Sequence, residues 1–225
     1  TEVFGALNEL MGPDDVVINA AGSMPSDLQC LWRASTPGSY HVEYAFSCMG
    51  YEIPAALGVK MARPDAEVVA IVGDGTYQML PMELATIVQQ REKVILVLLE
   101  NHGYASIGSL SESHGSQRFG TKFRMRDDEG HATDELVPLD IAANARSWGI
   151  DVLEVHSIDE FREAYAQAAA SSRTTMIHIE TDLHGPNPPS SGWWDVPVAP
   201  VSRLESTRSA HEQYAQASTA QRRFF

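Results

Sequence analysis

The chain has 225 residues, 44% of them hydrophobic, with a formal net charge of −14 and an isoelectric point near 4.9. This length can bury the core of one domain. The acidic balance argues against nucleic acid or an anionic membrane as a partner, because both attract basic surfaces. Two cysteines without metal-site spacing, no long apolar run and no opening signal-peptide pattern together predict a soluble, cytoplasmic protein with reduced thiols.

Apolar periodicity and helix-breaking residues predict alternating helices and strands along the chain. Helical spacing is expected over residues 3–10, 53–61, 79–90 and 139–148, and a capping-box pattern at Ser157 and Glu160 opens another helix. Short apolar runs predict strands at residues 16–19, 68–72, 94–99, 151–155 and 174–180. This alternation predicts an α/β fold, namely a doubly wound parallel sheet.

Two segments do not fit that alternation. Residues 110–136 are polar and too long for an ordinary connection, which suggests an active-site lid. From residue 186 the chain becomes rich in proline and contains Trp193 and Trp194. We therefore expect a domain over residues 1–185 and a tail over residues 186–225, whose tryptophans pack on the domain or on a neighbouring subunit rather than on substrate.

Polar residues follow two of the predicted strands. Gly73-Asp74-Gly75 comes directly after the strand at 68–72, and Glu100-Asn101-His102-Gly103 follows the strand at 94–99. Because parallel strands end at the same edge of a sheet, we expect these two groups to meet there. Asp74 alone is also compatible with simple helix capping, but the second group at the right place favours a ligand site.

The residue types of the two groups suit a diphosphate held through magnesium. Magnesium takes few protein oxygens and completes its shell with water and phosphate, and Asp74, Asn101 and the carbonyl of Gly103 can supply such oxygens. Small residues at Gly73 and Gly75 let the backbone approach a phosphate, and the amide of Thr76 can donate to it. Neither group contains Lys or Arg, which explains the need for a metal.

At these residues the chain resembles the thiamine-diphosphate enzymes, whose cofactor motif begins with Gly-Asp-Gly and ends in Asn-Asn or a variant; here the first Asn is Glu100. The resemblance implies that thiamine diphosphate and Mg²⁺ are the cofactors, with Asp74, Asn101 and the Gly103 carbonyl as metal ligands. It also implies that Met49 supports the bent cofactor, and that the carbonyl of Ser47 accepts from the aminopyrimidine. Further expected cofactor contacts are Gly22, Ser23, Gly73, Gly75, Thr76 and Tyr104.

Within these enzymes, the Ser111-Glu112-Ser113 and Trp193-to-Pro197 segments resemble the carboxyl-terminal portion of the trihydroxycyclohexanedione hydrolases of myo-inositol catabolism. That resemblance implies cleavage of a cyclic, polyhydroxylated 1,2-diketone to 5-deoxyglucuronic acid, with the cofactor as electron sink. It further implies a homo-oligomer, dimer or tetramer. The activating glutamate is expected on amino-terminal domains outside these residues, so the chain alone should carry half a site and turn over little.

The water-activating base is the least defined residue. His41 is our first candidate, although a histidine in a strand is more often structural; His114 and Arg118 of the expected lid could meet a polyhydroxy substrate. Two other functions stay open. One is a 2-oxo acid decarboxylase or acetolactate-type synthase, against which Ile107 argues, because several decarboxylases place a catalytic glutamate there. The other is a catalytically silent cofactor-binding fragment.

Overall fold

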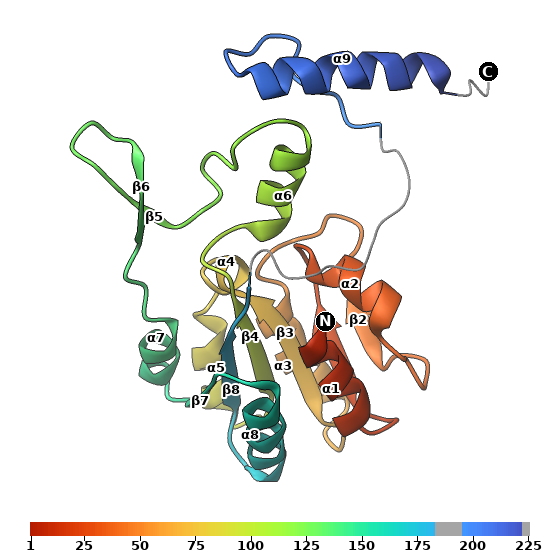
Figure 1. The fold of residues 1–225 in the computed structure, drawn as a ribbon. Helices are drawn as coiled ribbons and strands as arrows, with labels where there is room; N and C mark the ends of the chain where they lie inside the picture. The colour runs from red at the N-terminus through yellow and green to blue at the C-terminus, as the bar shows by residue number, and fades with distance from the viewer. Residues whose placement is uncertain (183–194, 222–225) are drawn as a thin grey trace.

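A six-stranded parallel sheet runs through the molecule in the strand order β2-β1-β3-β4-β8-β7 (Figure 1). The computed structural model describes residues 1–182 and 195–221. Each neighbouring pair of these strands is parallel, so the prediction of a doubly wound parallel sheet is confirmed. The strands are β1 (Val16–Asn19), β2 (Tyr40–Val42), β3 (Val68–Gly73), β4 (Ile95–Glu100), β7 (Asp151–Val155) and β8 (Thr175–Glu180).

Helices cover both faces of the sheet because the central strands are apolar on both sides. Val69 and Ile71 of β3 belong to one core cluster with α1 (Glu2–Leu10), α2 (Met24–Leu31) and α8 (Ile158–Ala170). Val68 and Val72 of the same strand belong to the opposite cluster. That cluster also contains residues of α3 (Glu52–Ala62), α4 (Asp74–Tyr77), α5 (Glu83–Gln90) and α7 (Ile141–Ser147).

The strand order reverses beside β1. The chain passes from β1 to β2 on one side and then to β3 on the other side of β1. Ligands of open α/β sheets bind in the crevice at the carboxyl ends of strands where the order reverses. The loop after β1, with Gly22-Ser23, and the start of α4 after β3, with Asp74-Gly75, border this crevice.

The helix predicted over residues 79–90 is wrong at its start. The structure has a short helix α4 directly after β3, and α5 begins only at Glu83. Pro81 between them has no backbone N–H to donate and interrupts a continuous helix. Met79 and Met82, on either side of this proline, are both exposed.

The segment predicted as a lid contains secondary structure of its own. Helix α6 (Ala105–Ser113) is followed by an antiparallel hairpin of β5 (Arg124–Arg126) and β6 (Ala132–Leu136). Figure 1 shows α6, the hairpin and the carboxyl-terminal helix α9 (Glu205–Ala220) beyond the carboxyl-end edge of the sheet. This part of the chain is therefore placed where a lid would act.

Helix α9 docks on the loop that follows α6. The hydroxyls of Ser206 and Thr207 donate to the carbonyl of Gly115, at 2.6 and 2.9 Å. The packing predicted for Trp193 and Trp194 lies outside the described residues. Within the described part of the chain, no helix is long and apolar enough to cross a bilayer.

Candidate functional site

Asp74 joins the two halves of the predicted motif. Its side chain is only 1% exposed; Oδ1 accepts from the amide of Gly75 at 2.8 Å and Oδ2 from the amide of Gly103 at 3.0 Å. The N-cap residue of α4 is Gly73 rather than Asp74. Capping of this helix therefore does not explain the carboxylate of Asp74. Parallel pairing of β3 with β4 brings Gly73 opposite Leu99, which is why the groups meet as expected.

Burial raises the pKa of Asp74 above its usual range, and the nearby Glu100 adds to this rise, whereas the backbone amides of Gly75, Gly103 and Asn101 oppose it. No ion pair of the described residues includes Asp74. A buried carboxylate in this setting is stabilised as an anion by a cation beside it. The electrostatics of Asp74 therefore suit a metal ligand.

Asn101 provides the second observation that fits a metal. Its Oδ1 is buried and has no hydrogen-bond partner among the described residues, although buried polar atoms are nearly always paired. Gly103 lies where only glycine fits, because a Cβ there would come within 2.2 Å of the carbonyl oxygen of Thr121. A carboxylate, an orphan amide oxygen and a glycine carbonyl are hard oxygen donors of the kind Mg²⁺ takes, with its remaining positions left to water and phosphate.

Met49 and Tyr104 lie across the Gly-Asp-Gly turn. A Cβ added to Gly75 would stand 2.8 Å from two ring atoms of Tyr104 and 3.5 Å from Cε of Met49. The ring of Tyr104 also meets Phe123 edge to face, with centroids 5.4 Å apart. The structure thus brings Met49, Gly75 and Tyr104 together, and any side chain at position 75 would close the space between them.

The remaining predicted residues lie in the segments that follow β1, β2 and β3. Gly22 and Ser47 line a cavity of about 360 Å³ together with Glu43 and Tyr44. Ser23 is the exposed residue before α2, Thr76 is buried in α4, and Gly73 packs near Cε of Met24. Ser47 has a left-handed backbone with φ of 51°, a conformation that few side-chain-bearing residues adopt.

Glu52 was not predicted as part of the site, yet it lies beside it. It is the first residue of α3 and is completely buried. Its Oε2 accepts from the amide of Gly50 at 3.2 Å, and its Oε1 from the amide of Ala21 at 3.5 Å. Burial raises the pKa of Glu52 to about 7, against opposing hydrogen bonds from backbone amides. A single acid ahead of a largely apolar helical run was the only signal in the sequence.

Glu100, which replaces the first Asn of the family motif, has partners of its own. Its Oε2 lies 2.6 Å from Nε2 of His178 on β8, and its Oε1 lies 3.3 Å from Nδ1 of His102. Nε2 of His102 lies in turn 2.8 Å from Oε1 of Glu180. These four side chains connect the ends of β4 and β8, and they turn the ring of His102 toward glutamates.

The structure does not bring His41 to this group. His41 lies within β2 opposite Ile18 of β1, and the cavity beside β2 is lined by Glu43 and Tyr44 instead. Arg118 is buried and bonded to Glu112 and Ser109, at 2.8 and 3.1 Å, so it supports the loop rather than facing outward. A role for His41 as the base therefore remains a prediction.

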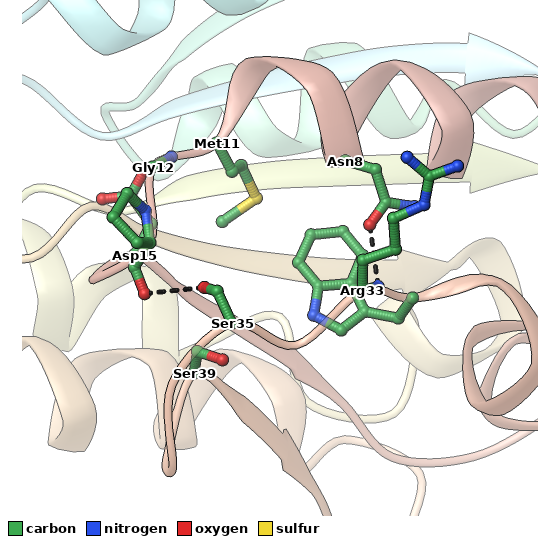
Figure 2. Close-up of a pocket in the computed structure, with 9 residues that line it drawn as sticks. Asn8, Met11, Gly12, Asp15, Arg33, Ser35 and Ser39 are labelled. Carbon is green, nitrogen blue, oxygen red and sulfur yellow. Dashed lines mark hydrogen bonds between the residues drawn. The ribbon is translucent and has the colours of Figure 1, made fainter.

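A second cavity, of about 250 Å³, lies at the opposite edge of the sheet (Figure 2). Asp15 and Ser39 line it, and they precede β1 and β2. The side chain of Asn8 accepts from the backbone of Arg33 at 2.9 Å, and Ser39 donates to Thr36 at 2.8 Å. Because such bonds tie its loops together, this cavity is explained by loop packing and is separate from the candidate site.

Comparison with known proteins connects this site to one family. The family described as thiamine pyrophosphate enzyme, C-terminal TPP binding domain, matches residues 20–179. The 3D-(3,5/4)-trihydroxycyclohexane-1,2-dione hydrolase of Bacillus cereus (strain AH820) is 40% identical over 213 residues, which are 94% of this chain and 33% of that protein. The hydrolase of the same name from Bacillus thuringiensis (strain Al Hakam) is 39% identical with the same coverage.

Solved structures of thiamine diphosphate-dependent and related decarboxylases have the same fold as this chain. Benzoylformate decarboxylase from Polynucleobacter necessarius matches with a TM-score of 0.69 and 25% identity, covering 81% of this chain and 33% of that one. The thiamine diphosphate-dependent 4-hydroxybenzoylformate decarboxylase of Rhodococcus jostii RHA1 matches with a TM-score of 0.67 and 23% identity, covering 80% and 32%. The chain thus spans about a third of the length of the curated relatives that it matches.

Proposed function

Since this chain belongs to the thiamine pyrophosphate enzymes, as their C-terminal TPP-binding domain, we propose that it anchors thiamine diphosphate and Mg²⁺ in an enzyme that opens trihydroxycyclohexane-1,2-dione by hydrolysis. The curated relatives that carry this hydrolase name are 39–40% identical to the chain. In this proposal the rest of the enzyme lies on further domains, and the whole works as a cytoplasmic homo-oligomer.

The observation that carries the anchoring role is the pair of unsatisfied groups at the ends of β3 and β4. Asp74 is a buried carboxylate without an ion pair among the described residues, and Oδ1 of Asn101 is a buried acceptor without a partner there. Both would be satisfied by one divalent cation that also binds a diphosphate. The carbonyl of Gly103 is the third protein ligand in this proposal.

Other residues of the chain would then shape the cleft. Met49 and Tyr104 flank the glycine turn and would hold the cofactor in one geometry, while Gly22, Ser23 and Ser47 would border its far side. Thiamine diphosphate, when bound, supplies the electron sink that allows a bond next to a carbonyl to be cleaved. The chain's own contribution is to bind, orient and partly bury that group.

Decarboxylation of a 2-oxo acid is the second candidate, because the solved structures that match in fold include decarboxylases. Against it stands Ile107, which is 58% exposed on α6, at the position where the family resemblance places a catalytic glutamate. The higher identity to the hydrolases also favours ring opening.

A chimera tests the proposal against this alternative. The matched third of the Bacillus cereus hydrolase would be replaced by this chain, and the purified protein assayed with trihydroxycyclohexanedione and with benzoylformate. We expect ring opening that requires Mg²⁺ and thiamine diphosphate and is lost with a chelator. Decarboxylation of benzoylformate without ring opening would contradict the hydrolase assignment, and activity that persists without either cofactor would contradict the anchoring role.

A further inference from the structure

Glu52 is a buried acid for which the proposed function gives no role. It stands at the start of α3 with no exposed surface, and its recorded partners are backbone amides rather than cations. Its neighbours in the helix, Ile53 and Ala56, belong to the apolar core. An apolar residue would satisfy the core at this position, since burying an ionisable group is costly unless its charge is compensated.

The two amides that Glu52 binds belong to different loops of the cleft. Ala21 directly precedes Gly22 and Ser23 in the loop between β1 and α2, while Gly50 directly follows Met49. Gly50 has φ of +95°, and a Cβ there would meet Cβ of Leu80 at 3.1 Å, so its backbone is held in a turn that favours glycine. The carboxylate of Glu52 therefore accepts hydrogen bonds from two segments of the cleft. One is the loop of Ala21, expected at the diphosphate, and the other is the turn of Gly50, expected beneath the cofactor rings.

We propose that Glu52 is a positioning residue that holds these two loops at the spacing required for binding thiamine diphosphate. This inference rests on the proposed cofactor role of the cleft. Two acceptor oxygens are needed, because each amide takes one, and a glutamine offers only one acceptor oxygen together with a donor group.

The test compares the wild-type chain with Glu52→Gln and with Glu2→Gln. Glu2 is the matched control because it is also the first residue of its helix, carries the same charge and is exposed. Hydrogen exchange at the amides of Ala21 and Gly50 reports on the loops without any cofactor. Calorimetry with thiamine diphosphate and Mg²⁺ reports on affinity.

We expect faster exchange at both amides and about tenfold weaker cofactor binding in Glu52→Gln, as the loss of one charge-assisted hydrogen bond predicts, with neither change in Glu2→Gln. Glu52→Asp, which keeps the charge but is shorter by one methylene, gives a second test if the glutamine variant does not fold: exchange at one or both amides should again rise and affinity should fall.

The outcomes separate this inference from the proposed function. If the wild-type chain does not bind the cofactor, both the anchoring role and the role of Glu52 toward it are overturned. If the wild type binds but the folded Glu52 variants keep wild-type affinity, the positioning role alone is overturned. The positioning role is supported if the amides of Ala21 and Gly50 exchange more slowly in the wild type than in the Glu52 variants, and if these variants bind the cofactor more weakly.

Discussion

At the scale of single residues, the two oxygen donors at the ends of β3 and β4 are not equivalent. Asp74 brings the charge, whereas Asn101 brings a neutral oxygen. We expect Asp74→Ala to lower Mg²⁺-dependent affinity for thiamine diphosphate by about 100-fold or more, and Asn101→Ala by about tenfold. Calorimetry measures both effects.

Asp140→Ala is the control for this comparison. Asp140 caps α7 by accepting from the amide of Ala143 at 2.7 Å, and loss of a cap costs about 1 kcal/mol of stability. If Asp74 served only such a local structural role, its alanine variant would behave like Asp140→Ala, with reduced thermal stability and undiminished cofactor affinity. That outcome would remove Asp74 from the metal site.

The buried carboxyl of Glu52 predicts a dependence of stability on pH. Its pKa is raised from 4.5 to about 7, so the folded chain holds this proton more tightly than the unfolded chain does. The resulting stabilisation is complete below the unfolded value and is lost as pH rises from about 4.5 to about 7. Glu52→Gln does not titrate and should therefore gain stability relative to the wild type over that interval.

The expected gain between pH 5 and pH 8 is about 2 kcal/mol, or about 5 °C in melting temperature. Differential scanning calorimetry of both proteins at the two pH values measures it. Glu2→Gln, which removes an exposed carboxyl at the first position of another helix, is the control. A difference between Glu52→Gln and the wild type that is independent of pH would mean that Glu52 does not titrate in this range in the folded chain.

The sequence predicted Asp74 and Asn101 because each follows a strand at a position where parallel strands end together. It could not predict Glu52, since the partners of its carboxylate are amides that only folding brings to it. The partner of Glu100, which replaces the first Asn of the family motif, could not be predicted either, because His178 is 78 residues away in the sequence. Residues that act through the local order of strands and turns were thus predictable, and those that act through distant contacts were not.

At the scale of elements, apolar runs located every strand of the central sheet that follows Gly50, because strands buried on both faces are nearly continuous in apolar residues. No apolar run marks β2, which is short and half-buried at the sheet edge. The helix predicted over residues 79–90 is wrong around Pro81. The helical spacing of apolar residues continues through this position, although the helix itself is interrupted there. Periodicity alone does not detect such a break.

The docking of α9 on the loop after α6 can be tested with two glycines of similar backbone. Gly115 has φ of +82° and a Cβ there would meet the carbonyl oxygen of Ser206 at 2.4 Å; Gly120 has φ of +72° and open space around it. Gly115→Ala should therefore lower the free energy of unfolding by about 1–3 kcal/mol, through backbone strain and displacement of α9. Gly120→Ala should lower it through backbone strain alone.

Hydrogen exchange would locate the difference between these two variants. Residues 111–121 and the start of α9 should exchange faster in Gly115→Ala than in Gly120→Ala, because only the former opens the hydrogen bonds from Ser206 and Thr207. Equal exchange in both variants, with equal loss of stability, would show that α9 does not restrain the loop.

At the scale of the whole molecule, large apolar side chains remain exposed near the candidate site. Phe46 and Phe119 are 86% and 84% exposed, and Tyr44 is 72% exposed beside the cavity that contains Gly22 and Ser47. Exposed apolar surface of this kind commonly marks a site of interaction. The chain also spans about a third of its curated relatives, so further domains are available in those proteins to cover such a surface.

This arrangement leads us to expect that the 225-residue chain binds cofactor without opening the diketone. Anchoring needs groups that the chain contains, whereas the activating glutamate is expected on amino-terminal domains. Adding the remaining two-thirds of the Bacillus cereus hydrolase in trans should restore ring opening, and Phe46→Ser should weaken the restoration while leaving cofactor affinity of the isolated chain unchanged. Product formation is followed by chromatography, with Asp74→Ala as the inactive control. Ring opening by the purified chain alone, absent from that control, would place the full catalytic machinery within these residues.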